Sequence, residues 1–212
     1  MTEELVKIES IIRNTRRYWY VDGLSEIAGG LIIFFSGIAY WVVAQMPNSN
    51  YKFFLLTMAQ PAIIILGSWL AQKILPKIKE QLTYPRSGYL VFRKPVKKRR
   101  FKRLILVGLI AAVVGALVTM VSTALPERYL PFLTSIFLAM ASIYIGYQTS
   151  VHRFYWVGLA LLIWGAFVSY MNFSNPLPYT LVFSGMGMIW IISGVITLFL
   201  YLRNTQPLAE EE

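Results

Sequence analysis

The sequence predicts an all-α fold, a polytopic membrane bundle of six transmembrane helices, from three observations. Hydrophobic residues make up 57% of the 212 residues and charged residues only 14%, against about 25% charged residues in soluble domains. The apolar residues fall in blocks long enough to cross a hydrocarbon core of about 30 Å, which takes roughly 20 helical residues. When these blocks alternate in direction, all but two of the 20 lysines and arginines fall on one side of the membrane.

The apolar blocks are expected to be helices, because backbone in lipid must satisfy its own hydrogen bonds. Together they form one integral membrane domain over residues 1–212. The predicted spans are 24–46, 53–72, 104–125, 132–149, 154–171 and 180–202. Prolines occupy several of the connections, where they commonly end helices. Pro61 lies inside the second span and predicts a kink, because proline removes one helix hydrogen bond.

The distribution of basic residues predicts the orientation. Cytoplasmic segments are enriched in lysine and arginine, so both termini and the connection 73–103 are expected in the cytoplasm. Only Lys52 and Arg128 fall on the opposite side. The small size, the absence of cysteine and the tight connections suggest a bacterial cytoplasmic membrane. The acidic N-terminal segment does not resemble a cleaved signal peptide, so we expect the first span to be retained.

Residues 2–20 predict a separate N-terminal amphipathic helix. Leu5, Ile8, Ile11 and Ile12 recur at helical spacing among basic residues. This pattern is typical of a helix that lies in the membrane interface. A helix packed on the cytoplasmic loop is the alternative.

Four of the spans carry two glycines separated by six residues. The pairs are Gly30 and Gly37, Gly108 and Gly115, Gly158 and Gly165, and Gly187 and Gly194. Seven residues make nearly two helical turns, so each pair marks one face, and membrane helices pack closely through such faces. An internal duplication, common in transporters, is the other interpretation. Packing is favoured, because the two most similar spans, the first and the sixth, are not equivalent in inverted halves.

Asp22 and Glu26 are acidic residues at the start of the first span, four positions apart. In one interpretation Asp22 is the N-cap, Gly23 marks a bend, and Glu26 lies in the favourable first helical turn. In the other, the pair shares a helix face and holds a cation or a basic partner. We expect the pair to end one helix, start the next and dock to an arginine. The candidate arginines are Arg13, Arg16, Arg17 and Arg86.

The connection 73–103 is predicted to be a basic cytoplasmic loop. Its middle, "TYPRSGYLVFRKP", favours a short ordered turn or hairpin. The run "KKRRFKR" follows, with six basic residues that can contact anionic lipid head groups: Lys97, Lys98, Arg99, Arg100, Lys102 and Arg103. Such a run also simply holds a loop in the cytoplasm. Nucleic acid is not favoured as a partner, because no known nucleic-acid-binding motif accompanies the run.

Signatures of catalysis and of metal or cofactor binding are sparse in this sequence. It has no cysteine, its one histidine is His152, and it contains neither a metalloprotease nor a phosphate-loop motif. We therefore expect no cofactor, no metal and no enzymatic activity. The sequence predicts a multi-pass membrane protein that binds a protein partner or anionic lipid through its cytoplasmic face. A small transporter or channel is the alternative, and a membrane enzyme would have only Asp22, Glu26 and His152 to use.

Overall fold

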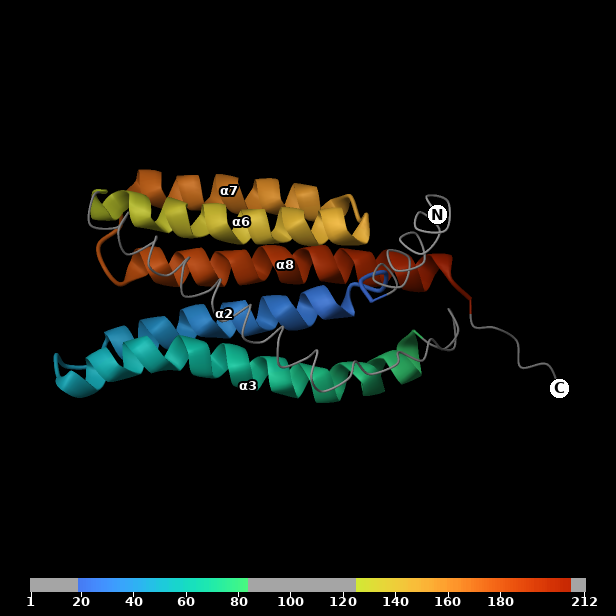
Figure 1. The fold of residues 1–212 in the computed structure, drawn as a ribbon, viewed down its shortest axis with the longest axis horizontal. Helices are drawn as coiled ribbons and strands as arrows, with labels where there is room; N and C mark the ends of the chain where they lie inside the picture. Colours follow the sequence, from blue (N-terminus) through green and yellow to red (C-terminus); the bar gives the residue numbers. More distant parts are fainter. Residues whose placement is uncertain (1–18, 84–124, 207–212) are drawn as a thin grey trace, which may run out of the picture.

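The computed structural model describes residues 19–83 and 125–206, and these residues form a helical bundle (Figure 1). Its elements are α2 (Leu24–Ala44), α3 (Asn50–Leu82), the short 3-10 helix η1 (Glu127–Tyr129), α6 (Leu130–Thr149), α7 (Arg153–Met171) and α8 (Leu177–Asn204). Five of these helices are long and apolar enough to cross a membrane. Within the described ranges there is no strand, so the all-α membrane prediction is confirmed at this level.

The predicted spans 24–46, 53–72, 132–149, 154–171 and 180–202 overlap α2, α3, α6, α7 and α8 respectively. The span 104–125, the interfacial helix 2–20 and the turn or hairpin of the basic loop lie outside the described residues, apart from residues 19, 20 and 125.

Helix α3 differs most from its predicted bounds. The prediction ended this span at residue 72 and began a loop at 73, but the helix continues through Pro76 to Leu82. The reason is that hydropathy detects only the apolar part of a helix. The residues that follow are mostly lysine, glutamine, glutamate and leucine, which are good helix formers in water. Pro61 lies within α3 as expected, and the helix curves along its length (Figure 1).

The helices pack in a simple order. Helix α2 lies between α3 and α8, and α8 in turn contacts the antiparallel pair α6 and α7 (Figure 1). Residues 19–26, the C-terminal ends of α3 and α8 and the start of α7 meet at one end of the bundle, called the Asp22 end below. The start of α8 and the η1 segment meet at the other end, called the Arg128 end.

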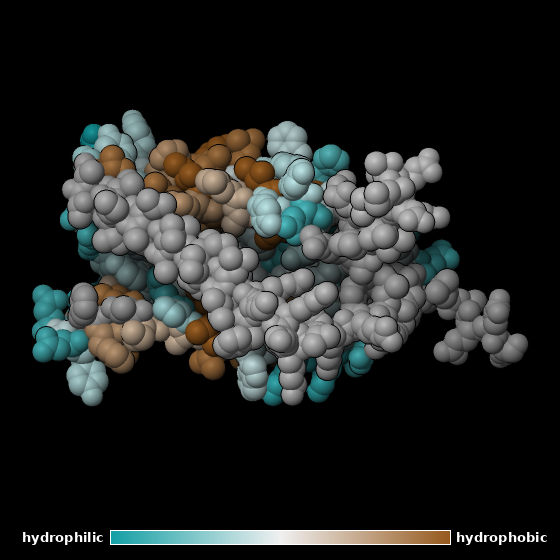
Figure 2. Space-filling model, viewed as in Figure 1, coloured by the Kyte–Doolittle hydropathy of each residue, from teal (hydrophilic) through white to brown (hydrophobic). Residues whose placement is uncertain are grey.

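The buried core lies between α6, α7 and α8. It is built from Ala139, Val157, Leu161, Val168, Val182 and Met186. Large apolar side chains elsewhere face outward on every long helix. On the face seen in Figure 2, hydrophobic side chains gather along the middle of the uppermost helices, α6 and α7, and hydrophilic ones lie toward the ends of these two helices. This pattern is expected for a bundle whose outer surface is solvated by lipid.

The glycine pairs lie in helix contacts. A Cβ on Gly187 would lie 2.5 Å from the backbone nitrogen of Phe34 and 2.7 Å from the carbonyl oxygen of Gly30. One on Gly158 would lie 2.9 Å from Ile143 on α6. The close approach of α2 to α8, and of α7 to α6, therefore depends on the absence of a side chain at these glycines, as the packing interpretation predicted. Gly108 and Gly115 lie outside the described residues.

Candidate functional site

The turn that precedes α2 positions the two carboxylates. Gly23 has φ 74° and ψ −9°, in the left-handed region, and a Cβ there would overlap the carbonyl oxygen of Gly194. Glycine is therefore required for both its conformation and its small size. Gly23, not Asp22, is the N-cap, which corrects the predicted position by one residue. The Asp22 side chain still accepts a hydrogen bond from the Leu24 amide at 3.2 Å, so it satisfies one of the orphan donors of the helix.

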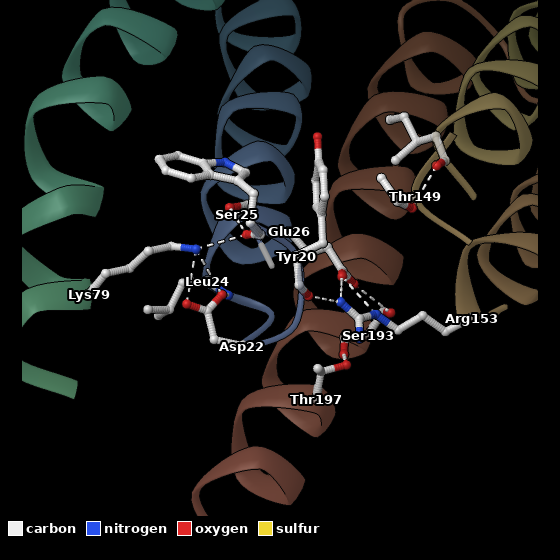
Figure 3. Close-up of polar contacts among 12 residues, drawn as sticks. Tyr20, Asp22, Leu24, Ser25, Glu26, Lys79, Thr149, Arg153, Ser193 and Thr197 are labelled. Atoms are coloured by element: carbon white, nitrogen blue, oxygen red, sulfur yellow. Dashed lines mark hydrogen bonds and ion pairs between the residues drawn. The ribbon is translucent and has the colours of Figure 1, made fainter. Parts of the chain in front are cut away.

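Asp22 is completely buried and forms an ion pair with Lys79 of α3 (Figure 3). The Lys79 ammonium lies 2.9 Å from one carboxylate oxygen and 3.1 Å from the other. It also donates to the Trp19 carbonyl at 2.8 Å and lies 4.5 Å from the centre of that residue's ring. The Thr83 hydroxyl donates to Asp22 at 3.1 Å. Lys79 is itself only 2% exposed, so this pair is held away from water.

Glu26 forms the second ion pair, with Arg153 at the start of α7 (Figure 3). The Arg153 Nε donates to Glu26 Oε1 at 2.8 Å, and Nη2 donates to the same oxygen and to the Tyr20 carbonyl. Ser193 of α8 donates to Glu26 Oε2 at 2.9 Å. Glu26 is 1% exposed and Arg153 26% exposed, so water reaches the guanidinium but not the carboxylate.

Tyr20 lies beside the second pair. Its ring meets the Phe154 ring edge-on, with the centroids 5.4 Å apart. Burial, followed by the negative charge of Glu26, raises the pKa of the Tyr20 phenol above its ordinary value. The phenol therefore stays neutral at physiological pH.

Each carboxylate has its own cation, and all four carboxylate oxygens accept hydrogen bonds. A buried charge is tolerated when it is paired and its remaining sites are hydrogen-bonded. Each carboxylate oxygen is therefore already engaged by at least one protein donor. Among the described residues there is also no group of three histidine, aspartate or glutamate side chains that could hold a metal. The arrangement therefore joins four helices and the entering chain at one point.

The two carboxylates could share a helix face only if the helix included residue 22, and α2 begins at Leu24, after Asp22. The side chains diverge, so that Asp22 points to α3 and Glu26 points to α7 and α8 (Figure 3). The expected arginine partner is confirmed for Glu26, but it is Arg153. The candidates Arg13, Arg16, Arg17 and Arg86 lie outside the described residues.

Sequence reasoning missed Lys79 and Arg153. Lys79 follows the apolar part of α3 and was assigned to a loop, and Arg153 was counted only as a topological charge. Alternating spans do place both residues at the same end as Asp22 and Glu26. That shared end was the signal that could have identified them. The third candidate, His152, precedes α7, and its ring lies near Tyr155 with centroids 6.2 Å apart.

The predicted lipid-contact residues lie outside the described part of the chain. They are Lys97, Lys98, Arg99, Arg100, Lys102 and Arg103. No protein-family model, curated protein or solved structure matches this chain. Its function must therefore be argued from its own residues.

Proposed function

We propose that this chain is a non-enzymatic multi-pass membrane protein that acts through its cytoplasmic face, as a subunit that binds a protein partner or anionic lipid. The observation that supports this most directly is the hydrogen-bonded corner around Asp22. One carboxylate contacts both Lys79 and Thr83, at the point where α3 ends. The N-terminal segment and the basic connection therefore leave the bundle next to each other.

The corner is fixed on both sides. The carbonyl of Trp19 accepts from Lys79 and from the Ser25 hydroxyl, at 2.8 and 3.0 Å. The Thr83 carbonyl accepts from the Tyr201 hydroxyl of α8 at 3.4 Å. Because Trp19 and Thr83 are both held at this corner, we infer that the two polar segments that begin there contribute to a single surface. That surface would combine the N-terminal residues with the basic run 97–103.

The ends of the described segments support the proposal of six spans. Thr83 lies at the Asp22 end and residue 125 at the Arg128 end. A further span between these two positions would join the two ends. Residues 104–125 supply one apolar block of the required length. With six spans both termini face the same side, and the positive-inside rule makes that side the cytoplasm.

This topology predicts which single-cysteine variants a thiol reagent can label from outside the cell. The sequence has no cysteine, so any labelling reports on the introduced residue alone. A Lys98→Cys variant is expected to be protected from a membrane-impermeant maleimide in intact cells and labelled after permeabilisation. Gln45→Cys, at an exposed position after α2, is the matched control and is expected to label in intact cells. Labelling of residue 98 from outside would overturn the proposed orientation.

The functional proposal predicts the loss of bound anionic lipid or partner when the basic run is neutralised. The test variant changes Lys97, Lys98, Arg99 and Arg100 to glutamine. Each basic residue near an anionic surface contributes about 1 kcal/mol, so the four changes together should weaken binding to anionic lipid by roughly a thousandfold. The measurement is affinity purification from membranes, with mass spectrometry of the copurified lipids and proteins.

A charge-conserving variant separates the two kinds of ligand. It exchanges lysine for arginine and arginine for lysine at the same four positions. Anionic lipid should be retained, because the charge is unchanged. A protein partner that uses the planar arginine group should be lost, because lysine cannot replace its paired donors. Unchanged lipids and partners in the neutralised variant would contradict the proposal.

A further inference from the structure

Two neighbouring cavities lie at the Arg128 end of the bundle, far from the ion pairs. One has a volume of about 330 Å³ and lies between η1, the start of α6, the end of α7 and the start of α8. The other has a volume of about 410 Å³ and lies between η1, α6 and α7. Arg128 and Asn172 line both cavities, so the two adjoin at these residues and are treated below as one site. Volumes of about 300–1,000 Å³ are usual for sites that bind small ligands.

The two cavities differ in chemistry. The first is polar, and its wall includes one carboxylate and one guanidinium, from Glu127 and Arg128, together with Ser174 and Asn175. The second is mainly aromatic and apolar, and it is lined by Arg128, Tyr129, Phe132, Ala166, Ser169, Tyr170 and Asn172. The two adjacent cavities therefore form a polar compartment, which contains one acidic and one basic side chain, and an apolar compartment between α6 and α7.

Arg128 is held at the junction of the cavities. Its guanidinium carbon lies 4.5 Å from the centre of the Tyr129 ring, and Nη2 donates to the hydroxyl of that residue. The Ser169 hydroxyl, which also lines the apolar cavity, accepts from the Phe132 amide at 3.1 Å. Arg128 is exposed, so its planar guanidinium is accessible to a phosphate group, which it can pair with through two donors.

We propose that the adjoining cavities bind one phospholipid with a primary-amine head group. Arg128 contacts its phosphate, Glu127 contacts its ammonium group, and an acyl chain lies along the apolar cavity. The membrane position fits, because the ends of spanning helices lie at the level of the lipid head groups. The charges fit as well, since one acidic and one basic side chain complement a zwitterion. A purely anionic head group would face the Glu127 carboxylate unfavourably.

This inference is independent of the proposed function, which concerns the opposite end of the bundle. The test is native mass spectrometry of the purified protein with an equimolar mixture of phosphatidylethanolamine, phosphatidylglycerol and phosphatidylcholine that share the same acyl chains. Lys97, Lys98, Arg99 and Arg100 are changed to glutamine in the wild-type background and in every variant, so that the basic run does not retain anionic lipid. The wild type should retain phosphatidylethanolamine preferentially. Glu127→Gln should reduce its preference over phosphatidylglycerol by about tenfold, the usual effect of losing a hydrogen bond to a charged group. Arg128→Gln should weaken all three lipids by a similar factor.

Two further variants sharpen the test. Glu127→Lys is expected to reverse the preference toward phosphatidylglycerol, which loss of folding could not do. Lys52→Gln is the matched control, because Lys52 lies at the same end of the bundle but lines neither cavity and donates to Asn48 at 3.2 Å. Its lipid preference should equal that of the wild type. Equal retention of the three lipids by the wild type, or the same selectivity in the Glu127 variants, would overturn the proposal.

Discussion

An Asp22→Asn variant is expected to lose about 3–5 kcal/mol of stability, because it leaves the Lys79 ammonium buried without a counter-charge. Lys79 is 2% exposed, and its remaining partners are the carbonyl oxygen and the ring of Trp19. Neither supplies the full negative charge that offsets desolvation. The variant should also weaken the hydrogen bond that the Thr83 hydroxyl donates to the same side chain. The contact between the end of α3 and the entering chain should then loosen.

The measurement is thermal unfolding of the purified protein in detergent, where the variant should melt well below the wild type. A double variant, Asp22→Asn with Lys79→Met, tests the cause. Removing both charges should recover much of the lost stability, since a buried pair replaced by apolar groups is often neutral. Glu80→Gln is the matched single-charge control, because Glu80 is exposed beside Lys79. An Asp22→Asn variant that melts with the wild type would show that the pair does not join the helices.

The two carboxylates show what could be predicted from the sequence. Their position at the start of α2 follows from the apolar block that begins beside them, and Glu26 lies in the first turn as expected. Their individual partners were not predicted, because Lys79 and Arg153 are distant in sequence and share the predicted cytoplasmic side with most of the other basic residues. To identify these partners one must know that α3 ends, and α7 begins, beside the start of α2. Hydropathy defines each span separately and carries little information about its neighbours.

Helix α3 shows a second limit. Its apolar block was identified, but its last turns lie beyond that block and carry Lys79. Local helix propensity would have extended it, because good helix formers lie on either side of Pro76. The helix does continue through this proline to Leu82. Lys79 was therefore missed, because hydropathy alone was used to place the end of a helix that extends past its apolar block.

The second large effect is expected from substituting a glycine where α2 packs against α8. The neighbouring residues Gly29 and Gly30 of α2 provide a control and a test position. Gly30→Ala should destabilise the protein by about 1–3 kcal/mol, the usual cost of overpacking. A Cβ at Gly30 would lie 2.8 Å from the Gly187 carbonyl oxygen and 2.8 Å from the Ile191 backbone nitrogen. Both atoms belong to the backbone of α8, so a side-chain rotation cannot relieve the overlap. The helices must move apart.

Gly29→Ala is the control, because it makes the same change one residue earlier. There a Cβ would lie 3.5 Å from the Trp190 ring, which is an ordinary contact. Alanine is favoured over glycine within a helix by about 0.5–1 kcal/mol, so this variant should be neutral or slightly more stable. Thermal unfolding in detergent should therefore order the proteins as Gly29→Ala at or above wild type, and Gly30→Ala below it. Equal melting of the two variants would mean that close approach of α2 and α8 does not require glycine at position 30.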